Sequence, residues 1–126
     1  MKYSGKVDPT HYGNTNKGES AVVFGEANKN SATRALLAGK LNVNSGANSV
    51  LLGLKNKNTA PSSLVLGGDN INEGAQSLVS GIANSNKGIG NIISGTNNKF
   101  LNEKSSYNIL TGSSIWVTGE NNSVSG

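Results

Sequence analysis

The chain has no cysteine, only two prolines among its 126 residues and only 5% aromatic residues. Without cysteine, neither a disulfide framework nor a thiolate metal site is possible. A hydrophobic content of 34% with so few aromatic side chains is a small supply for a conventional globular core. No apolar run approaches the ~20 residues of a membrane-spanning helix, and residues 1–17 lack the apolar core of a signal peptide. We therefore expect a mature fragment, with any export signal or membrane anchor outside this sequence.

Charged residues are also scarce, at 14% of the chain, and the formal net charge is +4. Most of the positive charge comes from lysines spread along the chain, of which Lys29, Lys57 and Lys99 share one position of the repeat described below. These three would form a broken basic ridge, although lysine also keeps a repetitive surface soluble and blunts sheet edges. No basic cluster interleaved with aromatic residues indicates nucleic-acid binding. We favour solubility as the role of the ridge.

The most prominent feature of the sequence is a period of 14 residues. Aliphatic residues stand two and three positions before each repeating glycine, and asparagines follow it by three and five positions until Phe100 breaks the second series. A fixed period of this kind is typical of stacked repeats that cannot bury their own cores singly. The repeating glycines are Gly25, Gly39, Gly53, Gly67, Gly81 and Gly95.

Each repeat reads as two short strands and two turns, which predicts an all-β parallel solenoid with rungs ~4.8 Å apart. A second small residue lies seven positions after the main glycine, at Ala32, Gly46, Ala60, Gly74 and Gly88. We expect glycine at these corners to supply positive φ. We expect the asparagine columns to form hydrogen-bonded ladders, as identical amides do in cross-β stacks.

The repeat extends over residues 14–126, and residues 1–13 form an irregular N-terminal segment. The phase slips by three residues after Gly95, which predicts a three-residue insertion within residues 100–107 that bulges outward.

The strand before each glycine is apolar on both faces, because its adjacent aliphatic residues point in opposite directions. One face can fill the solenoid, whereas the other needs a partner that this chain does not contain. The uncovered face would be a continuous apolar stripe, which soluble monomers rarely expose. We therefore predict an obligate oligomer, with packing in the assembly or the core by Val22, Phe24, Leu36, Val50, Leu52, Leu64, Leu66, Leu78, Ile92 and Ile109.

This repeat resembles the YadA-like head of trimeric autotransporter adhesins, whose 14-residue unit also begins with an Asn/Ser-Ser-aliphatic strand that ends in glycine. The matching segments include residues 48–53, 62–67 and 76–81. The resemblance implies a left-handed parallel β-roll, a homotrimer, and display at the outer membrane of a Gram-negative bacterium. It also implies adhesion to a host matrix protein such as collagen or to a host cell-surface receptor. The sequence departs from the family in its paired asparagines and in the Val, Leu or Ile that replaces the strand's alanine.

Positions that break the rules of the repeat are the candidates for ligand contact. We expect the apolar ones, rather than the lysines, to anchor a host protein, because buried apolar side chains dominate most interfaces. Trp116, which alternates with Ile115 and Val117, is expected to have a structural role. The candidate ligand residues are Val43, Leu54, Lys57, Ile71, Ile82, Phe100, Leu101 and Tyr107.

The sequence does not indicate an enzyme. Its one histidine, His11, stands with Asp8 in the irregular segment, and no catalytic triad or carboxylate pair emerges from the register. We expect no metal and no cofactor, because the repeated aspartates of calcium-binding rolls are absent. An ice-binding surface is disfavoured since no threonine column exists, but a trimeric segment of a phage or viral receptor-binding fibre remains the alternative to an adhesin.

Overall fold

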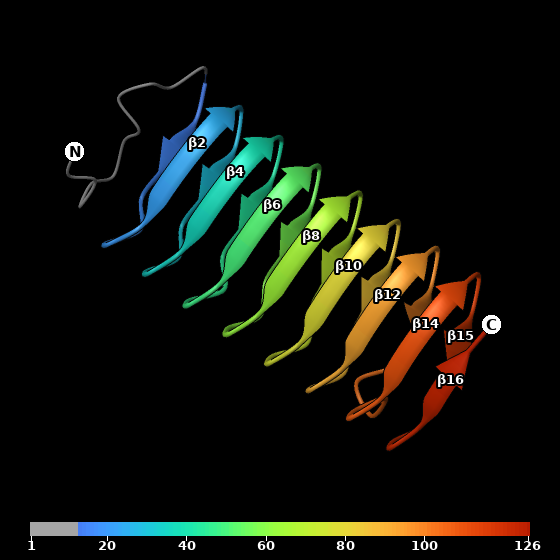
Figure 1. Ribbon diagram of the computed structural model, residues 1–126. Coiled ribbons are helices and arrows are strands. Elements are labelled where there is room, and N and C mark those ends of the chain that lie inside the picture. Colours follow the sequence, from blue (N-terminus) through green and yellow to red (C-terminus); the bar gives the residue numbers. More distant parts are fainter. Residues whose placement is uncertain (1–12) are drawn as a thin grey trace.

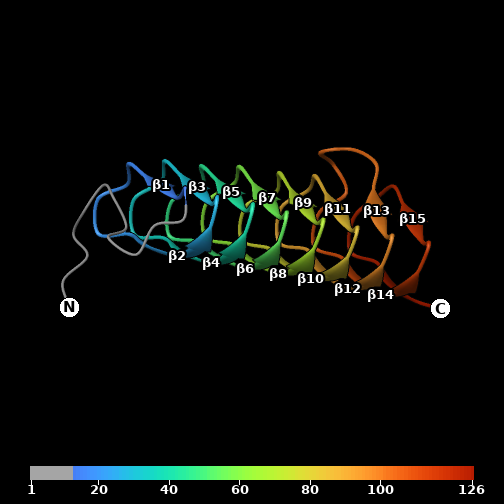
Figure 2. The same cartoon turned by 90° about the horizontal axis from the view of Figure 1, so that it is seen from above.

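The computed structural model describes residues 13–126, and in this part of the chain every regular element is a β-strand. The chain winds into a parallel β-solenoid of about eight turns, so the predicted all-β solenoid is confirmed. Figure 1 shows the five-residue strands side by side along one axis, and Figure 2 shows the shorter strands forming a second layer. His11 and Asp8 lie outside the described residues.

Each of the two layers is a parallel sheet of eight strands. The long-strand sheet contains β2 (Val22–Glu26), β4 (Leu36–Lys40), β6 (Val50–Leu54), β8 (Leu64–Gly68), β10 (Leu78–Ile82), β12 (Ile92–Thr96), β14 (Ile109–Ser113) and β16 (Ser123–Ser125). The short-strand sheet contains β1 (Thr15–Asn16), β3 (Lys29–Asn30), β5 (Val43–Asn44), β7 (Lys57–Asn58), β9 (Ile71–Asn72), β11 (Ser85–Asn86), β13 (Lys99–Phe100) and β15 (Trp116–Val117).

The register between neighbouring strands confirms the 14-residue spacing. Gly53 pairs with Gly67, and Asn44 pairs with Asn58, so each residue lies above its equivalent in the next turn. The spacing widens to 17 residues between β12 and β14, where Ile92 pairs with Ile109. The three additional residues are accommodated in the exposed segment 101–104, and the buried Ser105 lies above Gly88. Figure 2 shows this loop projecting from the stack before β14.

The interior includes an apolar column and two asparagine columns. The apolar column comes from the residue two positions before each glycine, and its members are at most 1% exposed: Val23, Leu37, Leu51, Val65, Val79, Ile93 and Leu110. The asparagines donate from one rung to the next, as in Asn58 Nδ2 to Asn44 Oδ1 at 2.9 Å and Asn72 Nδ2 to Asn58 Oδ1 at 2.7 Å. The predicted ladders are therefore confirmed. Among the described residues, no buried side-chain nitrogen or oxygen lacks a hydrogen-bond partner.

The second ladder ends where the sequence changes. Phe100 takes the asparagine position above Asn86 and is 1% exposed, and Val117 follows it in the same column. Phe100 has no amide to donate to Asn86, and Asn91 takes this role by donating from Nδ2 to Asn86 Oδ1 at 2.7 Å. This column is therefore apolar in β13 and β15.

The predicted positive φ is confirmed at the six main glycines, with values of 102° to 131°, but is wrong for the second series. Gly46, Gly74 and Gly88 do not adopt positive φ; a Cβ built on each would lie within 2.0 Å of the carbonyl oxygen of the next rung. The left-handed residues lie two positions after and five positions before the main glycine, as at Leu41 (φ 59°) and Arg34 (φ 51°). Their amides donate to the preceding rung, to Glu26 O and Glu19 O, which holds these corners in place.

Candidate functional site

The outer face of the long-strand sheet is an apolar strip that follows the stack. It consists of residues three and one positions before each glycine, and several of its large side chains are more than a third exposed, including Leu52 at 36%, Ile92 at 41% and Ile109 at 49%. The strip contains all ten residues predicted for packing: Val22, Phe24, Leu36, Val50, Leu52, Leu64, Leu66, Leu78, Ile92 and Ile109. None of the ten belongs to the buried core.

The polarity of this apolar strip changes along the stack. The column directly before the glycine begins with Phe24 and includes Leu52 and Leu66, but it continues as Ser80, Ser94 and Thr111. Charge enters the outer face only at the ends of β2 and β4, where Lys40 Nζ and Glu26 Oε1 form an ion pair of 3.2 Å. The N-terminal half is therefore the more hydrophobic part of the strip.

The predicted ligand residues divide between the two sheets. Val43, Lys57 and Ile71 are stacked in one column on the outer face of the short-strand sheet, where Val43 and Ile71 are 40% and 41% exposed. Leu54 and Ile82 end β6 and β10 of the long-strand sheet, and both are exposed. Gly68 of β8 pairs with both Leu54 and Ile82 and lies between them. These five residues do not form one site.

Near the insertion, one candidate is wrong and two are accessible. The Phe100 side chain lies in the core and cannot contact a ligand. Leu101 and Tyr107 are exposed at 48% and 62%, and the Tyr107 ring lies over Gly90, where a Cβ would approach ring carbon Cδ1 to 2.8 Å. The place of Phe100 in the asparagine series was the signal of its burial, because that whole column faces inward.

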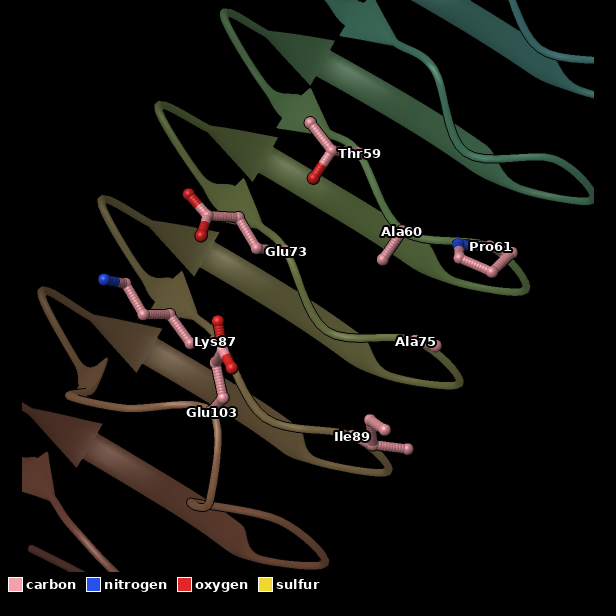
Figure 3. Close-up of a pocket in the computed structure, with 8 residues that line it drawn as sticks. All are labelled: Thr59, Ala60, Pro61, Glu73, Ala75, Lys87, Ile89 and Glu103. Carbon is pink, nitrogen blue, oxygen red and sulfur yellow. The ribbon is translucent and has the colours of Figure 1, made fainter.

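The insertion also borders a groove that sequence reasoning missed. The groove has a volume of about 360 Å³, and its polar side chains are Thr59, Glu73, Lys87 and Glu103. Figure 3 shows Glu73 and Lys87 on successive rungs, with Glu103 of the insertion loop beside them and Pro61 and Ile89 farther along the wall. The three extra residues were the available signal, since they interrupt an otherwise uniform face.

Trp116, for which a structural role is predicted, lies outside the buried core. It is 64% exposed, and the Lys99 Nζ lies 5.9 Å from the centroid of its ring. The fold therefore does not depend on burying this tryptophan.

Within residues 13–126, no three acidic or histidine side chains gather where they would hold a metal ion. The same part of the chain contains no helix long and apolar enough to cross a membrane. The chain has no significant match among protein-family models, curated proteins or solved structures.

Proposed function

We propose that this chain is the head of a bacterial surface adhesin, similar to the YadA-like heads of trimeric autotransporters. In this proposal the solenoid is a left-handed β-roll, and three copies pack through the apolar strip of the long-strand sheet. The head is displayed at the outer membrane through an anchor outside this sequence. It binds a host matrix protein such as collagen or a host cell-surface receptor, and it catalyses no reaction.

The observation that carries the proposal is the exposed apolar strip itself. It continues from Val22 on β2 to Ile109 on β14, and the chain has no helix in its described part to cover it. A patch of this length is larger than soluble monomers normally expose, so a second and third copy are the natural cover. The repeating, rigid backbone then presents the remaining faces outward as a binding surface.

Assembly is tested by the mass in solution. We expect multi-angle light scattering to give three times the chain mass of 12.9 kDa at micromolar concentration. A folded monomer under these conditions would contradict the assembly.

Adhesion is tested with immobilised collagen, other matrix proteins and host cells. Leu54→Ser and Ile71→Ser report on the two sheets separately, because Leu54 and Ile71 lie on different faces. We expect at least one variant to weaken attachment about tenfold while remaining trimeric, as loss of an apolar anchor does. Attachment unchanged in both variants would reject these residues as anchors, and absence of attachment to every host surface would reject the adhesin function.

A further inference from the structure

The outer face of the short-strand sheet carries a straight column in which lysines are separated by uncharged residues. The register stacks Thr15, Lys29, Val43, Lys57, Ile71, Ser85, Lys99 and Trp116 in this order. With strands ~4.8 Å apart, Lys29 and Lys57 are separated by two rungs, or ~10 Å, and Lys57 and Lys99 by three rungs, or ~14 Å.

The positive charge of this lysine column is not neutralised by ion pairs. The column contains no carboxylate, and the ion pair found in the described residues, Lys40 with Glu26, belongs to the other sheet. Lys17 and Lys29 border a shallow groove of about 320 Å³, together with Val43 and short polar side chains. Acidic residues approach the middle of the column, where Asp69 and Glu73 flank Ile71 in the sequence and Glu103 of the insertion loop lies beside Glu73 and Lys87. The N-terminal half of the column, with Lys29 and Lys57, is therefore its basic part.

An aromatic platform ends the lysine column. Trp116 pairs with Lys99 in the register, is 64% exposed and has the Lys99 ammonium 5.9 Å from its ring centroid. A flat, exposed indole offers an apolar surface to the C–H face of a sugar ring, while the adjacent ammonium offers charge to an anionic substituent.

The geometry points to this lysine column as a binding site for an extended, sulfated polysaccharide that lies along the solenoid. A linear glycan with anionic groups on alternate sugars places its charges at an interval comparable to two rungs, which is the separation of Lys29 and Lys57. Lys29, Lys57 and Lys99 bind the anionic groups, Val43 and Ile71 contact the sugar rings between them, and Trp116 stacks on one ring.

The column favours a polysaccharide over a single-stranded nucleic acid. Proteins that bind single strands provide successive aromatic side chains for successive bases, whereas Trp116 is the one aromatic residue of the column. The inference rests on the adhesin function proposed above and adds a ligand class at a face distinct from the assembly strip.

Titration of the intact chain with a size-defined heparin oligosaccharide tests the proposal. We expect binding that weakens with added salt, and an affinity reduced about tenfold or more in Lys29→Gln/Lys57→Gln/Lys99→Gln. Trp116→Leu is expected to reduce affinity about fivefold without loss of folding, because this side chain is largely exposed.

The matched control removes the same number of charges elsewhere. Arg34→Gln/Lys40→Gln is compared with Lys29→Gln/Lys57→Gln, and we expect only the second pair to weaken heparin binding. Equal weakening by both pairs would show attraction to net charge and overturn the site. Equal competition by single-stranded DNA, with no effect of Trp116→Leu, would overturn the polysaccharide assignment. Light scattering on the unmodified chain separates the two proposals. A monomer that still binds heparin through this column would refute the proposed trimer and leave the binding site in place.

Discussion

At the scale of single residues, the backbone approaches itself so closely that several positions have no room for a side chain. The main glycines combine φ values of 102° to 134° with a Cβ direction that points at the glycine carbonyl oxygen of the next rung. Conformation and space therefore exclude other residues independently. This double restriction explains why the glycine series is the most regular part of the repeat.

Two adjacent glycines allow this restriction to be tested. In Gly67→Ala the new Cβ would overlap Gly81 O at a φ of 111°, whereas in Gly68→Ala the nearest atom is Leu54 O at 3.7 Å. We expect Gly67→Ala to lower the free energy of unfolding by about 3 kcal/mol or more and Gly68→Ala by less than about 1 kcal/mol. Chemical denaturation at one fixed protein concentration measures both. A loss for Gly67→Ala as small as that for Gly68→Ala would show that the rungs can separate to admit a methyl group.

Interior asparagines provide a second test at this scale. The Asn58 amide donates to Asn44 Oδ1 and Ala60 O and accepts from Asn72 Nδ2, so Asn58→Ala leaves buried partners without hydrogen bonds. We expect a loss of about 3 kcal/mol in the free energy of unfolding. The control is Asn102→Ala in the exposed insertion loop, expected to cost about 1 kcal/mol or less. A tolerated Asn58→Ala would mean that the ladder does not contribute to stability.

At the scale of elements, each five-residue long strand has one face toward the interior and one toward solvent. Its second residue fills the interior, and its first and third residues form the apolar strip, so a change on the outer face leaves the core intact. The strip also becomes more polar from Leu66 to Ser80. The two ends of the strip should therefore differ in their tolerance of charge.

We expect Leu52→Asp to abolish the trimer, because it places a charge without a partner in the apolar half of the interface of every copy. Ser94→Asp lies in the more polar half and is expected to weaken assembly by a smaller factor. Sedimentation at several concentrations measures the loss, and circular dichroism should show the β structure retained in both. Equal disruption by the two variants would contradict the polarity gradient.

Much of the architecture could be predicted because the same residue types determine it in every copy of the repeat. The strands, the 14-residue spacing and the asparagine ladders each depend on residue types that recur at fixed positions. The corners could not be predicted, because the left-handed positions hold residues as different as Leu41, Arg34 and Tyr107. Hydrogen bonds between rungs hold these residues in the left-handed conformation, so no particular residue type marks the positions in the sequence.

The binding surfaces were harder to predict than the fold. Both faces of the long strand are aliphatic, so the sequence alone did not assign which face fills the interior. The three-residue slip hid the alignment of Trp116 with Lys99, which the register places in one column. For Phe100 the sequence did contain the answer. Its position in the inward-facing asparagine column indicates burial, whereas its aromatic side chain suggested a ligand contact.

At the scale of the whole molecule, the two sheets differ in character. The long-strand sheet has an apolar outer face, and the short-strand sheet carries Lys29, Lys57 and Lys99 on its outer face. In the proposed trimer the apolar strips meet at the axis, and three lysine columns face outward along the rod. Assembly would then multiply each binding column, which raises avidity for a polymeric ligand without new contacts.

The strand order also places β2 and β16 at opposite ends of the stack, as Figure 1 shows. In the proposed surface-anchored head, a pulling force between these two ends would act along the stack and open it one rung at a time, instead of shearing all strands together. Each rung of 14 residues stores roughly 45 Å of extra length, given an extended chain of ~3.4 Å per residue and a rung height of ~4.8 Å. We expect single-molecule extension to show a ladder of steps of about this length, whereas one abrupt rupture would contradict rung-by-rung opening. Such a head would lengthen under load before it releases what it holds.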